Sequence, residues 1–161
     1  MTGKPQQRGR PRTGARVAAV QALFQAEASG QPLEAVMAEF LRYRLQPVPG
    51  EGFEEGRIPE ADPGLFVGIL RKAATDPEGL DRIIAAHLAP NWPLERLDPV
   101  LRALLRAAAA ELRDRPDPPA RVVIREYLDI AHGFLAGEEP RFAAGVMDAM
   151  AHTLRADELA P

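Results

Sequence analysis

Apolar residues recur at helical spacing along almost the whole chain, and this periodicity is the feature that most restricts the fold. In residues 33–41 they fall at the i, i+3 and i+4 positions that share one face of a helix. Similar runs lie within residues 17–24, 65–70, 80–88, 97–112, 123–134 and 142–153. No segment shows the period of two that is typical of strands. The sequence therefore predicts an all-α fold of about seven helices.

Asp-Pro pairs mark where several of these helices are expected to begin. An aspartate at the N-cap accepts a hydrogen bond from the first turn, and proline at the first helical position lacks only an N–H that would be unpaired. The pairs are Asp62-Pro63, Asp76-Pro77 and Asp98-Pro99, and Asp117-Pro118-Pro119 opens the sixth helix in a similar way. Gly30 closes the first helix. Residues 46–61 are rich in Gly, Pro and Glu without periodicity, which predicts an exposed loop.

Charge is distributed unevenly along this 161-residue chain. Its formal net charge is -3, yet residues 1–16 carry five cations and no acid, and the other 15 Lys and Arg against 23 Asp and Glu leave the remainder at -8. Such asymmetry is typical of a basic arm for nucleic acid or membrane on an acidic body, although basic tails also serve only as solubilising segments. We expect residues 1–12 to form a flexible basic arm, followed by one domain over 13–161.

Few residues suggest catalysis or cofactor binding. The chain has no cysteine, which excludes disulfides and thiolate chemistry and agrees with a reducing cytoplasm. Its only serine, Ser29, has no evident base nearby, and its three histidines lack the spacing of a metal site. No apolar run reaches the roughly 20 residues that span a bilayer. We expect a cytoplasmic binding protein, not an enzyme, with no membrane, metal or cofactor.

The arm meets the first helix in a way that suggests phosphate binding. If Thr13 is the N-cap, Arg12 and Arg16 lie beside the first turn, where cations oppose the helix dipole at a cost of roughly 0.3–1 kcal/mol each. The N–H groups of the same turn favour an anion. A phosphate bound at this turn would neutralise the two arginines and accept hydrogen bonds from the N–H groups. The alternative is a basic tail that makes no specific contacts.

Single-stranded RNA also requires flat side chains on which its bases stack. Phe142 follows Pro140-Arg141 at the start of the last helix, where half exposure and a neighbouring cation would suit stacking; core packing is the alternative. Phe24 and His87 fit core or half-core positions by their pattern alone.

Four blocks of the sequence resemble the NusB family of bacterial transcription antitermination factors. They occur in the family's order and comprise AVQALFQAE at 19–27, LDRIIAAHL…NWPLERLDPVLRALLRAAAAEL at 80–112, PARVVIREYLDIAHGF at 119–134 and RFAAGVMDAM at 141–150. The resemblance implies two packed helical subdomains, about 13–90 and about 91–156. It also implies binding of the boxA element of ribosomal RNA leader transcripts together with the ribosomal protein NusE. With other Nus factors, this complex would modify RNA polymerase so that the polymerase reads through terminators.

By this resemblance, the RNA-contacting residues would be Arg8, Arg10, Arg12, Arg16, Phe24, His87, Arg141 and Phe142. The NusE surface would lie within residues 76–106, and a homodimer is left open. Two departures affect these roles: Phe24 lacks the hydroxyl of the family's usual tyrosine, and Leu101 stands where an acidic residue is usual.

Two other functions are left open by the sequence. A NusB-like domain also precedes the catalytic domain of certain ribosomal RNA cytosine-C5 methyltransferases, which carry catalytic cysteines that this chain lacks. An acidic helical interaction module with an incidental basic arm is the second.

Overall fold

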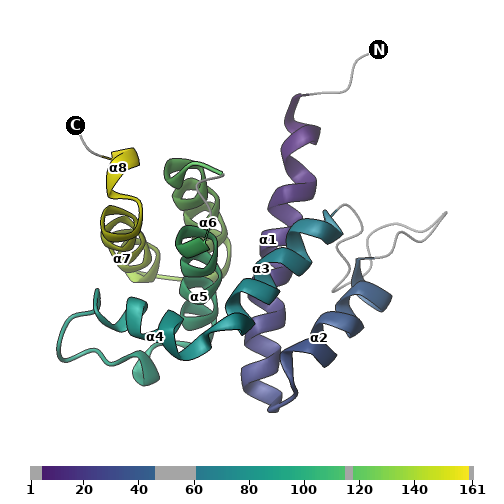
Figure 1. Cartoon of the computed structure of the whole chain (residues 1–161), viewed down its shortest axis with the longest axis horizontal. Coiled ribbons are helices and arrows are strands. Elements are labelled where there is room, and N and C mark those ends of the chain that lie inside the picture. The colour runs from purple at the N-terminus through teal and green to yellow at the C-terminus, as the bar shows by residue number, and fades with distance from the viewer. Residues whose placement is uncertain (1–4, 46–60, 115–117, 160–161) are drawn as a thin grey trace. The chain divides into compact units, whose positions relative to one another are not determined.

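The computed structural model describes residues 5–45, 61–114 and 118–159, with side chains in the first helix described from Pro11 onward (Figure 1). These residues form α-helices with one π-helical and one 3-10 turn and no strand, so the all-α prediction is confirmed. In chain order the elements are α1 (Pro5–Ser29), α2 (Leu33–Glu39), the π-helical turn η1 (Phe40–Arg44), α3 (Pro63–Thr75), α4 (Pro77–Ala85), the 3-10 turn η2 (Leu94–Arg96), α5 (Pro99–Asp114), α6 (Ala120–Phe134), α7 (Glu139–Leu154) and α8 (Ala156–Leu159). The predicted loop at 46–61 lies outside the described residues except for Ala61.

The three Asp-Pro helix starts are confirmed. Helices α3, α4 and α5 begin at the proline of each pair. The preceding aspartates accept hydrogen bonds from the first turn, with Oδ1 to N distances of 3.1 Å to Leu65, 3.0 Å to Gly79 and 2.8 Å to Val100. At the end of α1, Gly30 adopts a φ of 75° and donates its N–H to Ala26 at 3.0 Å, the left-handed C-cap for which glycine is suited.

The start of α6 is capped by a residue distant in sequence. The helix begins at Ala120, and the predicted cap residue Asp117 lies outside the described residues. The N–H of Ala120 donates to Oε1 of Glu158 in α8 at 2.8 Å. A carboxylate distant in sequence thus stabilises the positive end of this helix.

The first helix begins earlier than predicted. Helix α1 starts at Pro5 and continues through Pro11, so Thr13 is not an N-cap. Proline inside a helix removes one hydrogen bond and can bend the helix without ending it. The carbonyl of Pro11 accepts the N–H of Asp62 at 2.8 Å, which anchors this part of the helix to the start of α3.

The chain divides into two compact units, residues 1–70 and 71–161, instead of dividing near residue 90 as the sequence suggested. Helix α4 belongs to the second unit because it packs against α5 and α7. Arg106 of α5 holds Asp81 of α4 through two hydrogen bonds of 2.8 and 2.9 Å. His87, just beyond α4, reaches Thr153 of α7.

The core of the first unit combines an alanine-lined helix with stacked aromatic rings. Helix α1 contacts α2 and buries Ala15, Ala18, Ala19 and Ala22. Phe40 and Phe66 are fully buried, and their rings stack with centroids 5.8 Å apart at an interplanar angle of 18°. Phe40 is the first residue of the π-helical turn, so this pair joins the turn to α3.

The second unit is organised around α5, which packs against α4, α6 and α7 (Figure 1). Its residues 103–105 and 107–112 are all buried, the pattern of a helix surrounded by protein. Four of them are consecutive alanines, 107–110, whose small side chains let neighbouring helices approach closely. One polar group is accommodated here: the Tyr127 hydroxyl donates to Glu111 Oε2 at 2.6 Å.

Arg155 closes the end of α5 from the far end of the chain. Its guanidinium is 7% exposed and donates to the carbonyls of Glu111 and Leu112 at 2.9 and 2.8 Å, two of the four carbonyls that a helix leaves unpaired at its C-terminus. It also donates to Pro118 O at 3.1 Å and Glu158 Oε2 at 2.7 Å.

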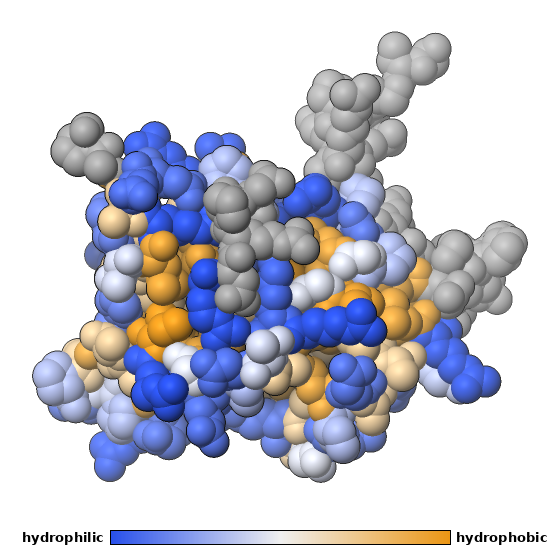
Figure 2. Space-filling model, viewed as in Figure 1, coloured by the Kyte–Doolittle hydropathy of each residue, from blue (hydrophilic) through white to orange (hydrophobic). Residues whose placement is uncertain are grey.

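Several large apolar side chains reach the surface. They are Phe24, Tyr43, Trp92, Val122 and Phe134. Figure 2 shows one face of the molecule, on which apolar patches lie among hydrophilic residues. None of the described helices is long and apolar enough to cross a membrane.

Candidate functional site

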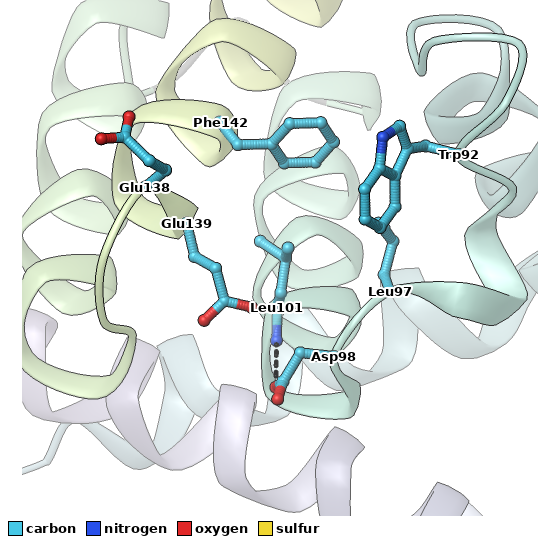
Figure 3. A pocket seen from close by; sticks show the side chains of 7 residues that line it. All are labelled: Trp92, Leu97, Asp98, Leu101, Glu138, Glu139 and Phe142. Atoms are coloured by element: carbon cyan, nitrogen blue, oxygen red, sulfur yellow. Dashed lines mark hydrogen bonds between the residues drawn. The ribbon is translucent and has the colours of Figure 1, made fainter.

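The second unit carries a surface pocket of about 250 Å³ with an aromatic and apolar lining and an acidic rim. Its residues come from the turn after α4, the start of α5 and the start of α7: Trp92, Leu97, Asp98, Leu101, Glu138, Glu139 and Phe142. In Figure 3 the ring of Phe142 points toward that of Trp92, and Leu101 lies below the Phe142 ring in this view. We call this the aromatic pocket.

Helix starts determine the shape of the aromatic pocket. Asp98 caps α5, and its Oδ1 accepts the N–H groups of Val100 and Leu101 at 2.8 and 3.4 Å (the latter dashed in Figure 3). Glu138 precedes α7 and receives the N–H of Phe142 on its main-chain carbonyl at 3.0 Å. The side chain of Glu138 makes no capping bond.

The chemistry of the aromatic pocket suits a flat or apolar group that carries hydrogen-bond donors. Phe142 is half-buried and Trp92 is 50% exposed, so both rings have area available for a partner. The three carboxylates at the rim accept hydrogen bonds and repel anions. A base with an amino group fits this combination, as does an apolar or basic side chain of a protein.

The predicted residues of the last helix lie at or beside this pocket. Phe142 lines the pocket and is half-buried, so part of its ring is accessible at the surface. Arg141 is exposed and is not one of the lining residues.

His87 has a structural environment. Its Nδ1 lies 2.8 Å from Ile83 O and its Nε2 lies 2.9 Å from Thr153 Oγ1, so both ring nitrogens have partners. The residue is half-buried and joins the end of α4 to α7. An RNA contact by His87 would use the remaining exposed ring area or compete with Thr153.

The N-terminal arginines occupy different environments. Arg12 is exposed, whereas Arg16 is 1% exposed and belongs to the interior of α1. The interpretation of Arg16 as a cation beside a helix N-terminus is therefore wrong, because the helix begins at Pro5 and packs this residue inward. The side chains of Arg8 and Arg10 lie outside the described residues, although their backbone belongs to α1.

Phe24 lies in a second groove, in the first unit. It is 38% exposed and shares a groove of about 430 Å³ with Gln21, Gln25, Ala28, Ser29 and Arg44. We call this the α1 groove. Its lining contains amides and a guanidinium but no carboxylate.

Sequence reasoning missed most of the aromatic pocket. The sequence indicated a helix cap at Asp98 but gave no binding role to Trp92, Glu138 or Glu139. The available signal was position: Asn91-Trp92-Pro93 falls between the helical runs at 80–88 and 97–112, and connecting segments run over the protein surface. The described residues contain no group of three His, Asp or Glu side chains suited to a metal ion.

The described residues thus form an all-helical protein with one aromatic and one amide-lined recess on its surface. The profile described as the NusB family matches residues 13–152, and the chain belongs to the NusB family. Two relatives, both named transcription antitermination protein NusB, support this. The protein of Granulibacter bethesdensis is 56% identical over 95% of this chain and 94% of its own length. That of Gluconobacter oxydans is 48% identical over 88% and 86%.

Solved structures share the fold. A NusB of T. maritima aligns with a TM-score of 0.67 and 27% identity over 99% of this chain and 96% of its own. NusB in a crystal structure of antitermination factors NusB and NusE with double-stranded RNA aligns with a TM-score of 0.70 over 93% and 99%. That chain is 20% identical and so compares in fold alone.

Proposed function

We propose that this protein is an RNA-binding transcription antitermination factor that binds boxA-containing RNA together with NusE. The observation that carries the proposal is family membership: the chain matches named antitermination proteins over nearly their full length at up to 56% identity. In this proposal the complex joins RNA polymerase with other Nus factors in the cytoplasm and carries it past terminators. The protein's contribution is binding and not catalysis.

In this proposal, charged and aromatic residues contact different parts of the RNA. Arg8, Arg10 and Arg12 attract the phosphates of the RNA, since arginines neutralise the backbone and release counterions. Arg16 contributes to α1 instead, because it is buried. Phe24 and Phe142 offer rings on which bases stack, and Arg141 adds a cation beside the second ring.

The aromatic pocket also supports a protein partner. Ribosomal proteins bind the anionic backbone of RNA and are accordingly basic, so the rim carboxylates Asp98, Glu138 and Glu139 favour their approach. Leu97 and Leu101 supply apolar contact area. We therefore propose that NusE binds at residues 92–101 and the start of α7.

The proposal is tested by RNA binding to boxA and to a scrambled sequence of equal length, each with and without a NusE-type protein. We expect tighter binding to boxA and a further gain when the partner is present. Phe142→Ala is expected to weaken RNA binding by about 1–3 kcal/mol while the melting temperature is retained. Equal affinity for the two RNAs at all partner concentrations would instead favour the acidic interaction module.

The methyltransferase alternative predicts a different result. A domain of that enzyme class would associate with structured ribosomal RNA without preference for boxA. The relatives at 56% and 48% identity are named antitermination proteins and match this chain over most of their length, which favours the antitermination function.

Sedimentation of the free chain separates a monomer from a homodimer before RNA is added.

A further inference from the structure

The α1 groove contains a guanidinium whose plane is already held in place. The Cζ atom of Arg44 lies 4.4 Å from the centroid of the Phe40 ring, which itself stacks on Phe66. Its Nη2 also donates to Gln25 Oε1 at 3.4 Å. A planar cation held against a buried ring loses little freedom when it binds, and Arg44 is one of the residues that line the groove.

Phe24 provides a second flat surface in the same groove. Its ring is 38% exposed, far more than the core rings Phe40 and Phe66. Aromatic rings and arginine planes are the two surfaces on which proteins stack unpaired bases of single-stranded RNA. A volume of about 430 Å³ is within the usual range of small-molecule pockets, roughly 300–1,000 Å³, and accommodates one base.

One amide in the groove has an unused acceptor. Gln25 is engaged on both sides, because it accepts from Arg44 and donates to Glu39 Oε2 at 2.8 Å. Gln21, one turn earlier on α1, has a buried Oε1 for which the described residues supply no donor. Rotation of this side chain would bring the carbonyl oxygen to a base, and every base carries an N–H donor on its pairing edge.

We propose that the α1 groove binds one unstacked base of the RNA, which stacks on the Arg44 guanidinium beside Phe24 and donates a hydrogen bond to Gln21. This inference rests on the proposed RNA-binding function and deepens it, because it names Arg44 and Gln21 as base-contacting residues. The π-helical turn is the element that positions Arg44, in agreement with the frequent occurrence of such turns at functional sites.

The role of the plane is tested with Arg44→Lys, which keeps the charge and removes the flat surface. The probe is a fluorescently labelled boxA-containing oligonucleotide. We expect Arg44→Lys to weaken binding by about 5- to 150-fold, the range for loss of one stacked base. Arg42→Lys is the matched control, because Arg42 is exposed in the same turn and lies 5.4 Å over Tyr43 outside the groove; its affinity should be unchanged.

The role of the amide is tested with Gln21→Met, which has a similar shape but no acceptor. We expect RNA affinity to fall by about 2- to 13-fold, the range for one hydrogen bond, while the melting temperature stays equal or rises because an unpaired buried acceptor is gone. If Gln21 has only a structural role, Gln21→Met should lower the melting temperature, and any loss of RNA affinity should follow from that loss of stability.

The occupant is identified with oligonucleotides in which each base in turn is removed. One abasic position should weaken the wild type and leave Arg44→Lys unaffected, because the contact is already lost. The inference is overturned if the loss from each abasic position adds in full to the loss from Arg44→Lys. It is also overturned if Arg44→Lys impairs only binding of the NusE-type protein. If the wild type fails to prefer boxA, the proposed function fails; if Phe142→Ala alone weakens RNA, only the groove inference fails.

Discussion

The two units carry recesses of opposite chemistry. The α1 groove of the first unit is lined by amides, a guanidinium and one ring, whereas the aromatic pocket of the second has three carboxylates around two rings. The first suits the anionic backbone and an unpaired base, and the second suits donors and repels phosphate. The two units thus differ in the charge of their recesses, although each recess contains at least one partly exposed aromatic ring.

The walls of the two recesses are also held in different ways. Stacking of Phe66, Phe40 and Arg44 orients the α1 groove. The aromatic pocket depends instead on the helix start at Asp98 and on α7. Loss of packing should therefore damage the first recess, and loss of hydrogen bonds at helix ends should damage the second.

Phe40→Ala is expected to produce the largest effect, because it removes a fully buried ring from the core of the first unit. We expect unfolding free energy to fall by about 3–5 kcal/mol in chemical denaturation. Hydrogen exchange should show the loss of protection chiefly in α1 and α2. Phe134→Ala, at a ring that is 45% exposed on α6, should stay within about 0.5 kcal/mol of the wild type. Equal losses for the two variants would contradict a packing-dependent first unit.

Arg155→Met is the corresponding change in the second unit. It leaves the carbonyls of Glu111 and Leu112 without the donors that Arg155 supplies, and we expect a loss of about 2–5 kcal/mol. Thermal unfolding measures it, with the exposed Arg121→Met on α6 as the control. A melting temperature equal to that of the control variant would show that water replaces the guanidinium without cost.

Salt dependence separates charge on the first unit from stacking on the second. Arg12→Gln removes one exposed cation and should reduce the log–log slope of RNA affinity against salt by about 0.7. Phe142→Ala should weaken binding at every salt concentration and leave that slope unchanged. If the log–log plots of affinity against salt for both variants run parallel to that of the wild type, Arg12 does not contact a phosphate.

The smallest expected effect concerns pH. The N–H of Ala120, and then the guanidinium of Arg155, lower the pKa of Glu158 below its ordinary value of 4.5. A lowered folded-state pKa contributes stability above the unfolded-state value, and that contribution is lost as pH falls through the folded value. The difference in melting temperature between wild type and Glu158→Gln should be greatest near neutral pH and shrink below about pH 4.5. A difference that grows with acidity would contradict this assignment.

The sequence predicted what depends on neighbours along the chain. The caps at Asp62, Asp76 and Asp98 follow from local hydrogen bonds, and the all-α fold follows from periodicity. Features that depend on distant partners could not be predicted. Glu158 caps α6 from 38 residues away, and the burial of Arg16 depends on packing around α1.

The candidate site was predicted only in part for the same reason. Phe142 could be singled out because it follows Pro140-Arg141 at a helix start. Its neighbours in the pocket could not, since Trp92 and Glu138 are brought together by the packing of α4, α5 and α7. Arg44 gave no sequence signal, because a π-helical turn has the same apolar pattern as the helix that it continues.

The contact of Arg155 with the end of α5 has a consequence for synthesis of the chain. A growing polypeptide folds from its N-terminus as it leaves the ribosome. The carbonyls of Leu112 and Glu111 receive the guanidinium only after residue 155, 43 and 44 positions further along the chain, has emerged. The C-terminal end of α5 therefore stays without these donors while α6 and α7 are being made, and it completes its hydrogen bonds only after both helices have followed it.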